Sequence, residues 1–174
     1  MKIYLVRHGE VLHNAMNKYN NEDEDLNEKG IIQAKDIRAN IKSIDYDIII
    51  SSPLIRAKHT SKIINVNNKE IVIENRITER NPGSLSGQPI SVTNRDEYWN
   101  YNTTIQYGTS ENIKTFFNKV YEFLDELKTK GYKSVLIVAH SGVTKAFSSY
   151  FEGMGDGMLL NRGLKNCEMK EYEL

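Results

Sequence analysis

Four short apolar runs divide the chain into alternating segments. They are Ile3–Val6, Ile48–Ile50, Ile71–Ile73 and Val135–Ala139, and they are rich in β-branched residues. A short, continuously apolar run is typical of a strand that is buried on both faces of a parallel sheet. We therefore predict that these four runs form buried parallel strands.

Apolar positions that recur every three to four residues predict a helix after the first strand. Asn27 is placed to cap this helix, and its apolar face contains Ala34, Ile37, Ile41 and Ile44. Asparagine is a favoured N-cap because its side-chain oxygen accepts a hydrogen bond from a free backbone N–H. The pattern predicts one helix over this stretch.

Two further helices carry their own start signals. Ser52 followed by Pro53 is typical of an N-cap and a first-turn proline, which predicts a helix to about Ile64. Ser110 is placed to cap a long helix that Gly131 would end. One stripe of this helix is apolar and contains Ile113, Phe116, Phe117, Val120, Leu124 and Leu127.

The remaining segments complete an alternating order. A helix is expected from His140 to about Phe151, and a last strand from about Cys167 to Leu174. Strands that alternate with helices predict a three-layer α/β/α sandwich with a mostly parallel central sheet, here as a single domain over residues 1–174. Residues 80–110 show no clear period, so we expect a substrate loop or lid there.

Charge and cysteine content limit the partners of the chain. Its 174 residues include 23 Lys and Arg and 23 Asp and Glu, so the net charge is zero. A nucleic-acid or membrane surface needs a basic excess, and an anion site here requires a local concentration of cations. Cys167 is the only cysteine, and no signal peptide or membrane-spanning stretch is evident. We therefore expect a cytoplasmic protein of unknown oligomeric state without nucleic-acid or membrane contacts.

Candidate functional residues follow the predicted strands. Arg7 and His8 come directly after the first strand, and Arg56 lies one helical turn beyond the second. Glu79 follows the third strand, and His140 follows the fourth. Ligands of such folds bind beyond the carboxyl ends of the strands, so these side chains are predicted to converge at one edge of the sheet.

This combination of side chains suits phosphoryl transfer. Arginine presents a permanently charged donor fork that matches phosphate oxygens. A neutral imidazole such as that of His8 can attack phosphorus and form a phosphohistidine, which water then hydrolyses. Glu79 can protonate the leaving alcohol and then deprotonate the attacking water.

Several motifs resemble those of the histidine phosphatase superfamily, which includes the cofactor-dependent phosphoglycerate mutases. Arg7–Glu10 resembles the opening Arg-His-Gly motif of the family. Further similar elements, in the family's order, are Asp25–Ala34, Ser51–Ala57, Glu79–Gly87 and Val138–Val143. The resemblance extends over nearly the whole chain.

The resemblance implies roles for the candidate residues. His8 would be the nucleophile, and Arg7, Arg56 and a protonated His140 would hold the transferring phosphoryl group. Glu79 would be the proton donor. The substrate would be a small-molecule phosphomonoester, and neither a metal nor a cofactor is implied.

Further residues are expected to contact the substrate. Asn14 matches a phosphate-pocket asparagine, and Asn17, Arg80 and Ser141 are candidate substrate contacts. Lys145 is expected to be structural. Two histidines outside the motifs, His13 and His59, are expected on the surface or in packing. The aromatic residues of the 80–110 region are expected either to line the pocket or to pack beneath the loop: Tyr98, Trp99, Tyr101 and Tyr107.

Departures from the mutase pattern favour a hydrolase. Asn81 and Pro82 stand where mutases carry an aromatic residue, and only 61 positions separate Glu79 from His140. This spacing has no room for the longer basic insertion of the mutases. Mutase-type transfer and a catalytically silent phosphate-binding protein remain the alternatives. The leaving group stays open among a sugar phosphate, phosphoserine, a nucleoside phosphate and α-ribazole phosphate.

Overall fold

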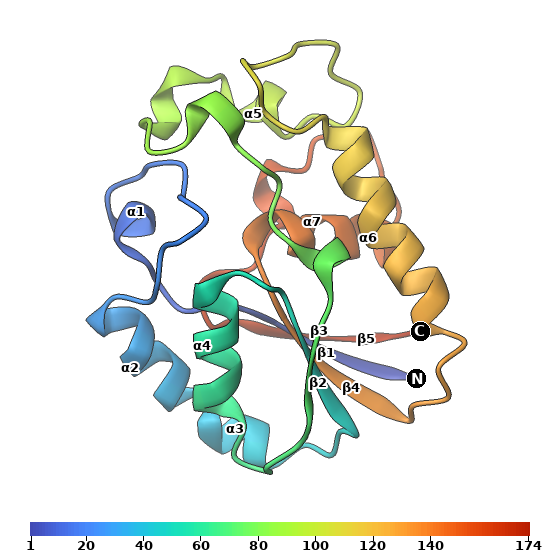
Figure 1. The fold of residues 1–174 in the computed structure, drawn as a ribbon. Coiled ribbons are helices and arrows are strands. Elements are labelled where there is room, and N and C mark those ends of the chain that lie inside the picture. Colours follow the sequence, from blue (N-terminus) through green and yellow to red (C-terminus); the bar gives the residue numbers. More distant parts are fainter.

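A five-stranded sheet forms the centre of the protein (Figure 1). The computed structural model describes residues 1–174. The strand order is β3-β2-β4-β1-β5, and only β5 runs antiparallel to its neighbour. The strands are β1 (Lys2–Arg7), β2 (Ile48–Ser51), β3 (Ile71–Ile73), β4 (Ser134–Ala139) and β5 (Met169–Glu173). The predicted mostly parallel α/β sheet, including its last strand, is confirmed.

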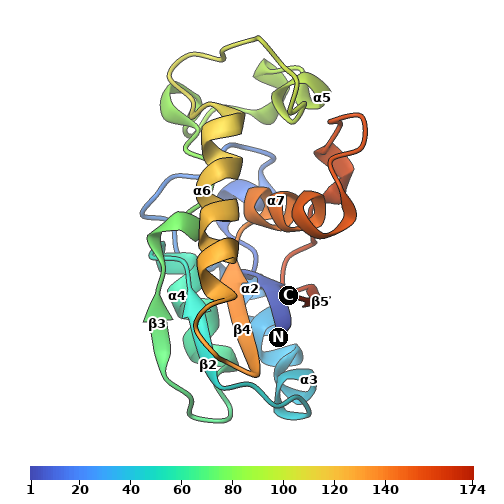
Figure 2. The same cartoon turned by 90° about the vertical axis from the view of Figure 1, so that its right-hand side faces the viewer.

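Helices cover both faces of the sheet, and Figure 2 looks onto the face that α6 and α7 cover. Alternate residues of β1 enter separate cores, because successive side chains of a strand point to opposite faces. One face carries α2 (Glu28–Asp36), α3 (Arg38–Lys42) and α4 (Ile55–Ile64), and the other carries α6 (Ile113–Leu127) and α7 (Ser141–Glu152). None of these helices is long and apolar enough to cross a membrane.

Both serine caps predicted from the sequence are wrong. The helix after β2 begins at Ile55, because the strand continues through Ser51 and the next three residues make the turn out of the sheet. Ser52 bonds to a histidine instead, as described below. The long helix is capped by Asn112, whose Oδ1 accepts from the backbone N–H of two residues of the first turn, while Ser110 is buried and lies before the cap.

Two other elements differ from the predicted pattern. Asn27 caps its helix as predicted, with Gly30 N–H donating to Oδ1 at 2.8 Å, but the helix divides at Ile37 into α2 and α3. The ψ angle of −6° at Ile37 opens the helical turn there. The strand β3 is not buried, and the side chain of Ile73 is 46% exposed. The reason is that β3 lies at the edge of the sheet and pairs only with β2. The helix α6 ends at Leu127, before Gly131.

The 80–110 region is structured and forms one end of the molecule, at the top of Figures 1 and 2. Tyr98 and Trp99 are buried in the larger core, and Tyr101 and Tyr107 pack against it. Packing of these aromatic rings fixes the region although its sequence has no periodic pattern. The short elements here and elsewhere are α1 (Leu12–Ala15), η1 (Asn75–Ile77), η2 (Gly83–Leu85), η3 (Ile90–Val92), α5 (Arg95–Tyr98) and η4 (Leu160–Arg162).

Candidate active site

Two histidines lie side by side where β1 and β4 end. The parallel register pairs Arg7 with Ala139, so the next residue of each strand leaves the sheet at the same level. The backbone N–H of His8 donates to Ala139 O at 2.9 Å, which extends the strand pairing by one residue. The ring centroids of His8 and His140 are 5.0 Å apart, and both side chains are buried. The predicted meeting of two imidazoles at one sheet edge is observed.

The ring of His8 is held in one tautomer. Its Nδ1 lies 2.7 Å from the carbonyl oxygen of Gly9, which can only accept, so Nδ1 carries the proton and Nε2 has a free lone pair. Burial, reinforced by the charges of Arg56 and Arg7, lowers the pKa of His8 well below its ordinary value. The imidazole is therefore neutral at pH 7, which is the form that can act as a nucleophile.

The expected protonation of His140 is not favoured in the protein alone. Burial, followed by the charge of Arg56, lowers the pKa of His140 well below its ordinary value. Its Nε2 lies 2.7 Å from the hydroxyl of Ser52, and its Nδ1 is buried without a hydrogen-bond partner. His140 lies beside His8 but not on the wall of the adjoining cavity. A cationic His140 would need a bound anion to offset its desolvation.

Two arginines near the histidines lack carboxylate partners. Nη1 of Arg7 donates to Leu164 O at 2.9 Å, and Nη1 of Arg56 donates to Asn21 O at 2.8 Å. The Nε atoms of both arginines are buried and have no hydrogen-bond partner. Burial lowers the pKa of both guanidinium groups, because neither charge is neutralised within ion-pair distance. An anion bound between them would relieve this cost.

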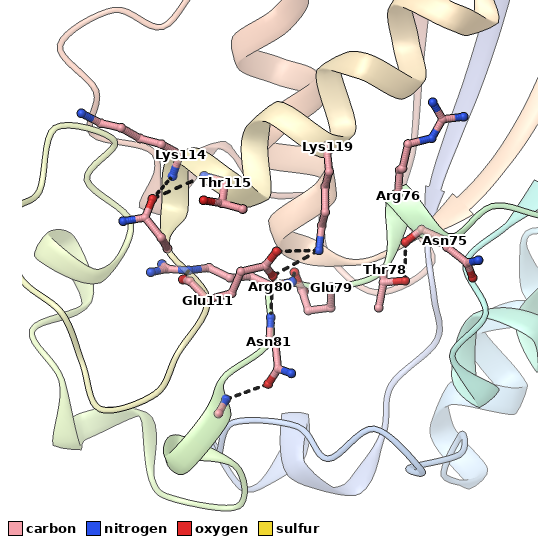
Figure 3. A network of polar contacts seen from close by, with 12 residues as sticks. Asn75, Arg76, Thr78, Glu79, Arg80, Asn81, Glu111, Lys114, Thr115 and Lys119 are labelled. Carbon is pink, nitrogen blue, oxygen red and sulfur yellow. Dashed lines mark hydrogen bonds and ion pairs between the residues drawn. The ribbon is translucent and has the colours of Figure 1, made fainter.

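The carboxylate of Glu79 lies at the N-terminus of α7. Its Oε1 accepts from Arg80 N–H at 2.9 Å, and both of its oxygens lie 3.1 Å from Gly142 N. A Cβ at position 142 would come within 2.1 Å of Oε1, so the glycine provides the space for this carboxylate. Figure 3 shows Glu79 among polar side chains of residues 75–81 and 111–119. The carboxylate is thus held at the rim of the histidine site.

A cavity of about 830 Å³ opens beside His8. All of the candidate residues from the sequence except His140 line its wall: Arg7, His8, Asn14, Asn17, Arg56, Glu79, Arg80 and Ser141. A volume of this size is ordinary for a small-molecule site. No three His, Cys, Asp or Glu side chains gather closely enough to hold a metal ion.

Asn14 is held by two other asparagines. Its Nδ2 donates to Asn20 Oδ1 at 3.1 Å, and its Oδ1 accepts from Asn166 Nδ2 at 3.3 Å. Asn166 also donates to the carbonyl oxygen of His8 at 3.0 Å, and so ties the loop that follows η4 to the end of β1. Sequence reasoning missed Asn166, because no local pattern marks a contact across 158 residues.

The donors of Arg80 are used within the protein. Its Nε donates to Glu111 O at 2.8 Å, and its Nη1 donates to Tyr98 O. Its guanidinium carbon lies 4.0 Å from the centre of the Tyr98 ring. Arg80 therefore fixes the aromatic wall of the cavity, and direct substrate contact by its fork would require these bonds to break. Beside it, Lys119 Nζ donates to Glu111 Oε1 at 2.8 Å (Figure 3).

Five cations on the cavity wall were not assigned there from the sequence, among them Lys145 and Arg95. Lys145 was expected to be structural, and Arg95 lies in the region without a period; both line the cavity. Partners outside the site hold the other two histidines, since His13 Nδ1 lies 3.0 Å from Glu24 and His59 Nδ1 lies 2.8 Å from Asp25.

The fold and the site together define an α/β protein with a buried histidine pair and two arginines at the carboxyl edge of its sheet. The chain belongs to the histidine phosphatase superfamily (branch 1), whose family model matches residues 3–174. This membership, together with relatives that are named as phosphatases, supports phosphatase activity.

Relatives and solved structures agree with this assignment. Phosphoserine phosphatase 1 of Hydrogenobacter thermophilus is 29% identical over 150 residues, which cover 81% of this chain and 71% of the relative. A phosphoserine phosphatase mutant from Entamoeba histolytica, solved in complex with phosphoserine, has a TM-score of 0.82 and 26% identity, with 98% of this chain and 89% of the other covered. The α-ribazole phosphatase of Shigella flexneri has a TM-score of 0.86 at 21% identity, with 100% and 91% covered, and shows the likeness of fold.

Proposed function

We propose that the protein hydrolyses small phosphomonoesters through a phosphohistidine intermediate on His8. One observation carries the proposal: the neutral ring of His8 has a free Nε2 and lines a cavity together with two unpaired arginines. Arg7 and Arg56 would bind the phosphoryl oxygens, and Asn14 would add a polar contact at the same end.

The chemistry proceeds in two displacements at phosphorus. Nε2 of His8 attacks, an N–P bond forms, and the bond from phosphorus to the ester oxygen breaks. Glu79, protonated at the start, gives its proton to the leaving oxygen, so an alcohol departs. The Glu79 carboxylate then takes a proton from water, the hydroxide attacks phosphorus, and the N–P bond breaks to release phosphate.

His140 stabilises charge in this scheme. Its ring lies next to that of His8 and its Nδ1 has no partner in the protein. A phosphoryl dianion would raise the pKa of His140 and oppose the effect of its burial. Asn17 and Ser141 are assigned to the leaving-group part of the cavity, whose wall they form.

Hydrolysis is favoured over the two alternatives. The chain retains both the nucleophile and the candidate acid, which a silent phosphate-binding protein does not need. Relatives named as phosphoserine phosphatases support hydrolysis of a small phosphorylated metabolite. Others of similar identity are named as probable phosphoglycerate mutases, so the preference for hydrolysis rests on the short spacing between Glu79 and His140, which has no room for the mutase insertion.

The direct test is turnover by purified protein against a panel of phosphomonoesters in the presence of a metal chelator. We expect phosphate release, and we expect His8→Ala to lower kcat/KM by roughly 10³-fold or more, as for loss of a covalent nucleophile. His59→Ala is the matched control, since that ring lies outside the cavity. Equal rates for the parent protein and His8→Ala would overturn the proposal.

A further inference from the structure

The cavity carries more positive charge than one phosphoryl group needs. Eight lysines and arginines line it against four glutamates, although the whole chain has no net charge. Arg7 and Arg56 together match the charge of a phosphoryl dianion. The remaining excess points to a second anionic group on the molecule that binds here.

Lys145 is the most deeply buried lysine of the cavity wall. It lies on α7, is only 4% exposed, and takes part in none of the ion pairs of the protein. Its Nζ donates to Ser141 Oγ at 3.2 Å and lies 5.0 Å from the centre of the Trp99 ring. An ammonium has three donors, and lysine is almost never fully buried without a charged partner. Lys145 therefore keeps donors for a ligand.

The backbone opposite Lys145 makes room for its ammonium. Gly163 has φ −82° and ψ 143°, which any residue can adopt, so conformation does not require a glycine there. A Cβ at position 163 would come within 2.3 Å of Lys145 Nζ and within 2.8 Å of Ser141 Oγ. The glycine thus allows the ammonium to occupy this part of the cavity wall.

Arg95 supplies a second unpaired cation from α5. Its Nη1 donates to the hydroxyl of Tyr19 at 3.0 Å, and its guanidinium carbon lies 5.5 Å from the centre of the Tyr98 ring. Arg95 takes part in none of the ion pairs, and its positive charge contributes to lowering the pKa of Lys145. The other charged groups that act on Lys145 are Glu79 and Arg7, one of each sign.

We propose that Lys145, supported by Arg95, binds a carboxylate on the leaving group, so that the enzyme selects phosphorylated hydroxy acids over phosphorylated alcohols. The inference rests on the proposed function, because it places the ester phosphoryl group at Arg7 and Arg56. The Lys145 ammonium, which lies between Ser141 and an aromatic ring, is a compact donor that suits a carboxylate oxygen.

The test is a binding measurement that does not depend on turnover. In the His8→Ala background, isothermal titration compares 3-phosphoglycerate with glycerol 3-phosphate, which has an alcohol in place of the carboxylate. We expect 3-phosphoglycerate to bind at least ~10-fold more tightly, the effect of one charge-assisted hydrogen bond. Lys145→Met should remove this preference while changing the affinity for glycerol 3-phosphate by less than about 3-fold.

Two further variants keep the result interpretable. Gly163→Ala places a methyl group against the ammonium and should also reduce the preference, even if Lys145→Met does not fold. Lys165→Met removes an exposed charge of the same cavity wall and should leave the preference unchanged. Equal affinity for the two esters, no binding of 3-phosphoglycerate, or a preference that survives both Lys145→Met and Gly163→Ala would overturn the inference. The two proposals can fail separately. If the preference depends on Lys145 but the parent protein, which keeps His8, releases no phosphate from any ester, the proposed hydrolysis is contradicted and the carboxylate site is retained.

Discussion

The hydroxyl of Ser52 lies 2.7 Å from Nε2 of His140, across the sheet edge between β2 and β4. This bond holds the second imidazole against the first and leaves its Nδ1 as the unpartnered ring nitrogen. Ser52 is therefore a positioning residue for the histidine pair.

Ser52→Ala tests this role. Loss of one hydrogen bond to His140 should lower kcat by about 5-fold, the effect of about 1 kcal/mol at the transition state, with KM less affected. Ser52→Thr retains a hydroxyl and should recover part of the loss. Unchanged kcat for Ser52→Ala would show that the bond does not matter for the reaction.

Glu79→Gln tests the proton donor. An alkyl phosphate needs a proton on its leaving oxygen, so its kcat should fall roughly 10²- to 10⁴-fold. An aryl phosphate with a good leaving group should lose less in the step that forms the intermediate. Glu111→Gln is the matched control, since that carboxylate lines the same cavity but is paired with Lys119. Equal losses for Glu79→Gln and Glu111→Gln would rule out the assigned role.

The pH profile tests the state of His8. Because its pKa is lowered well below 6.5 by burial and two arginines, its nucleophilic neutral form persists as the pH falls through 6.5. We expect kcat/KM, corrected for ionisation of the substrate phosphate, to show no loss with a midpoint near 6.5. A loss of kcat/KM at acid pH with a midpoint near 6.5, which persists when each of the other histidines is replaced, would contradict the buried, neutral ring of His8.

The pKa of Lys145 predicts that carboxylate binding weakens at alkaline pH. Burial lowers its pKa to about 8, so its ammonium is charged below that pH and lost above it. A bound carboxylate needs the charged form, so Kd for 3-phosphoglycerate should rise up to roughly 10-fold per pH unit above 8. The Kd of glycerol 3-phosphate should stay flat over the same range. Parallel curves for the two esters would contradict a carboxylate at Lys145.

The strands were predictable because both faces of a central strand are buried and leave a continuous apolar run. The run Ile71–Ile73 has the same composition but forms an exposed edge, since composition does not record how many neighbours a strand has. The site residues at strand ends were predictable for a related reason: parallel strands end at one edge. His8 and His140 directly follow two neighbouring parallel strands, so they meet at that edge.

What the sequence did not predict depends on contacts between distant segments. Ser52 has the right residue type for a helix cap, but its hydroxyl bonds to His140, 88 residues away. Lys145 occupies a helix position whose burial in a cavity wall depends on Gly163 and Trp99, and neither contact leaves a periodic signal. Local propensity and periodicity carry no information about such partners.

The most direct measurement is to trap the intermediate. Protein is mixed with a turned-over phosphomonoester, quenched under alkaline denaturing conditions that preserve phosphohistidine, and digested for mass spectrometry. The account predicts one added phosphoryl group on the peptide that contains His8, absent from His8→Ala and increased in Glu79→Gln when an aryl phosphate is used. Steady turnover with no phosphoryl group on any histidine, or with the group on His140 instead, would contradict it.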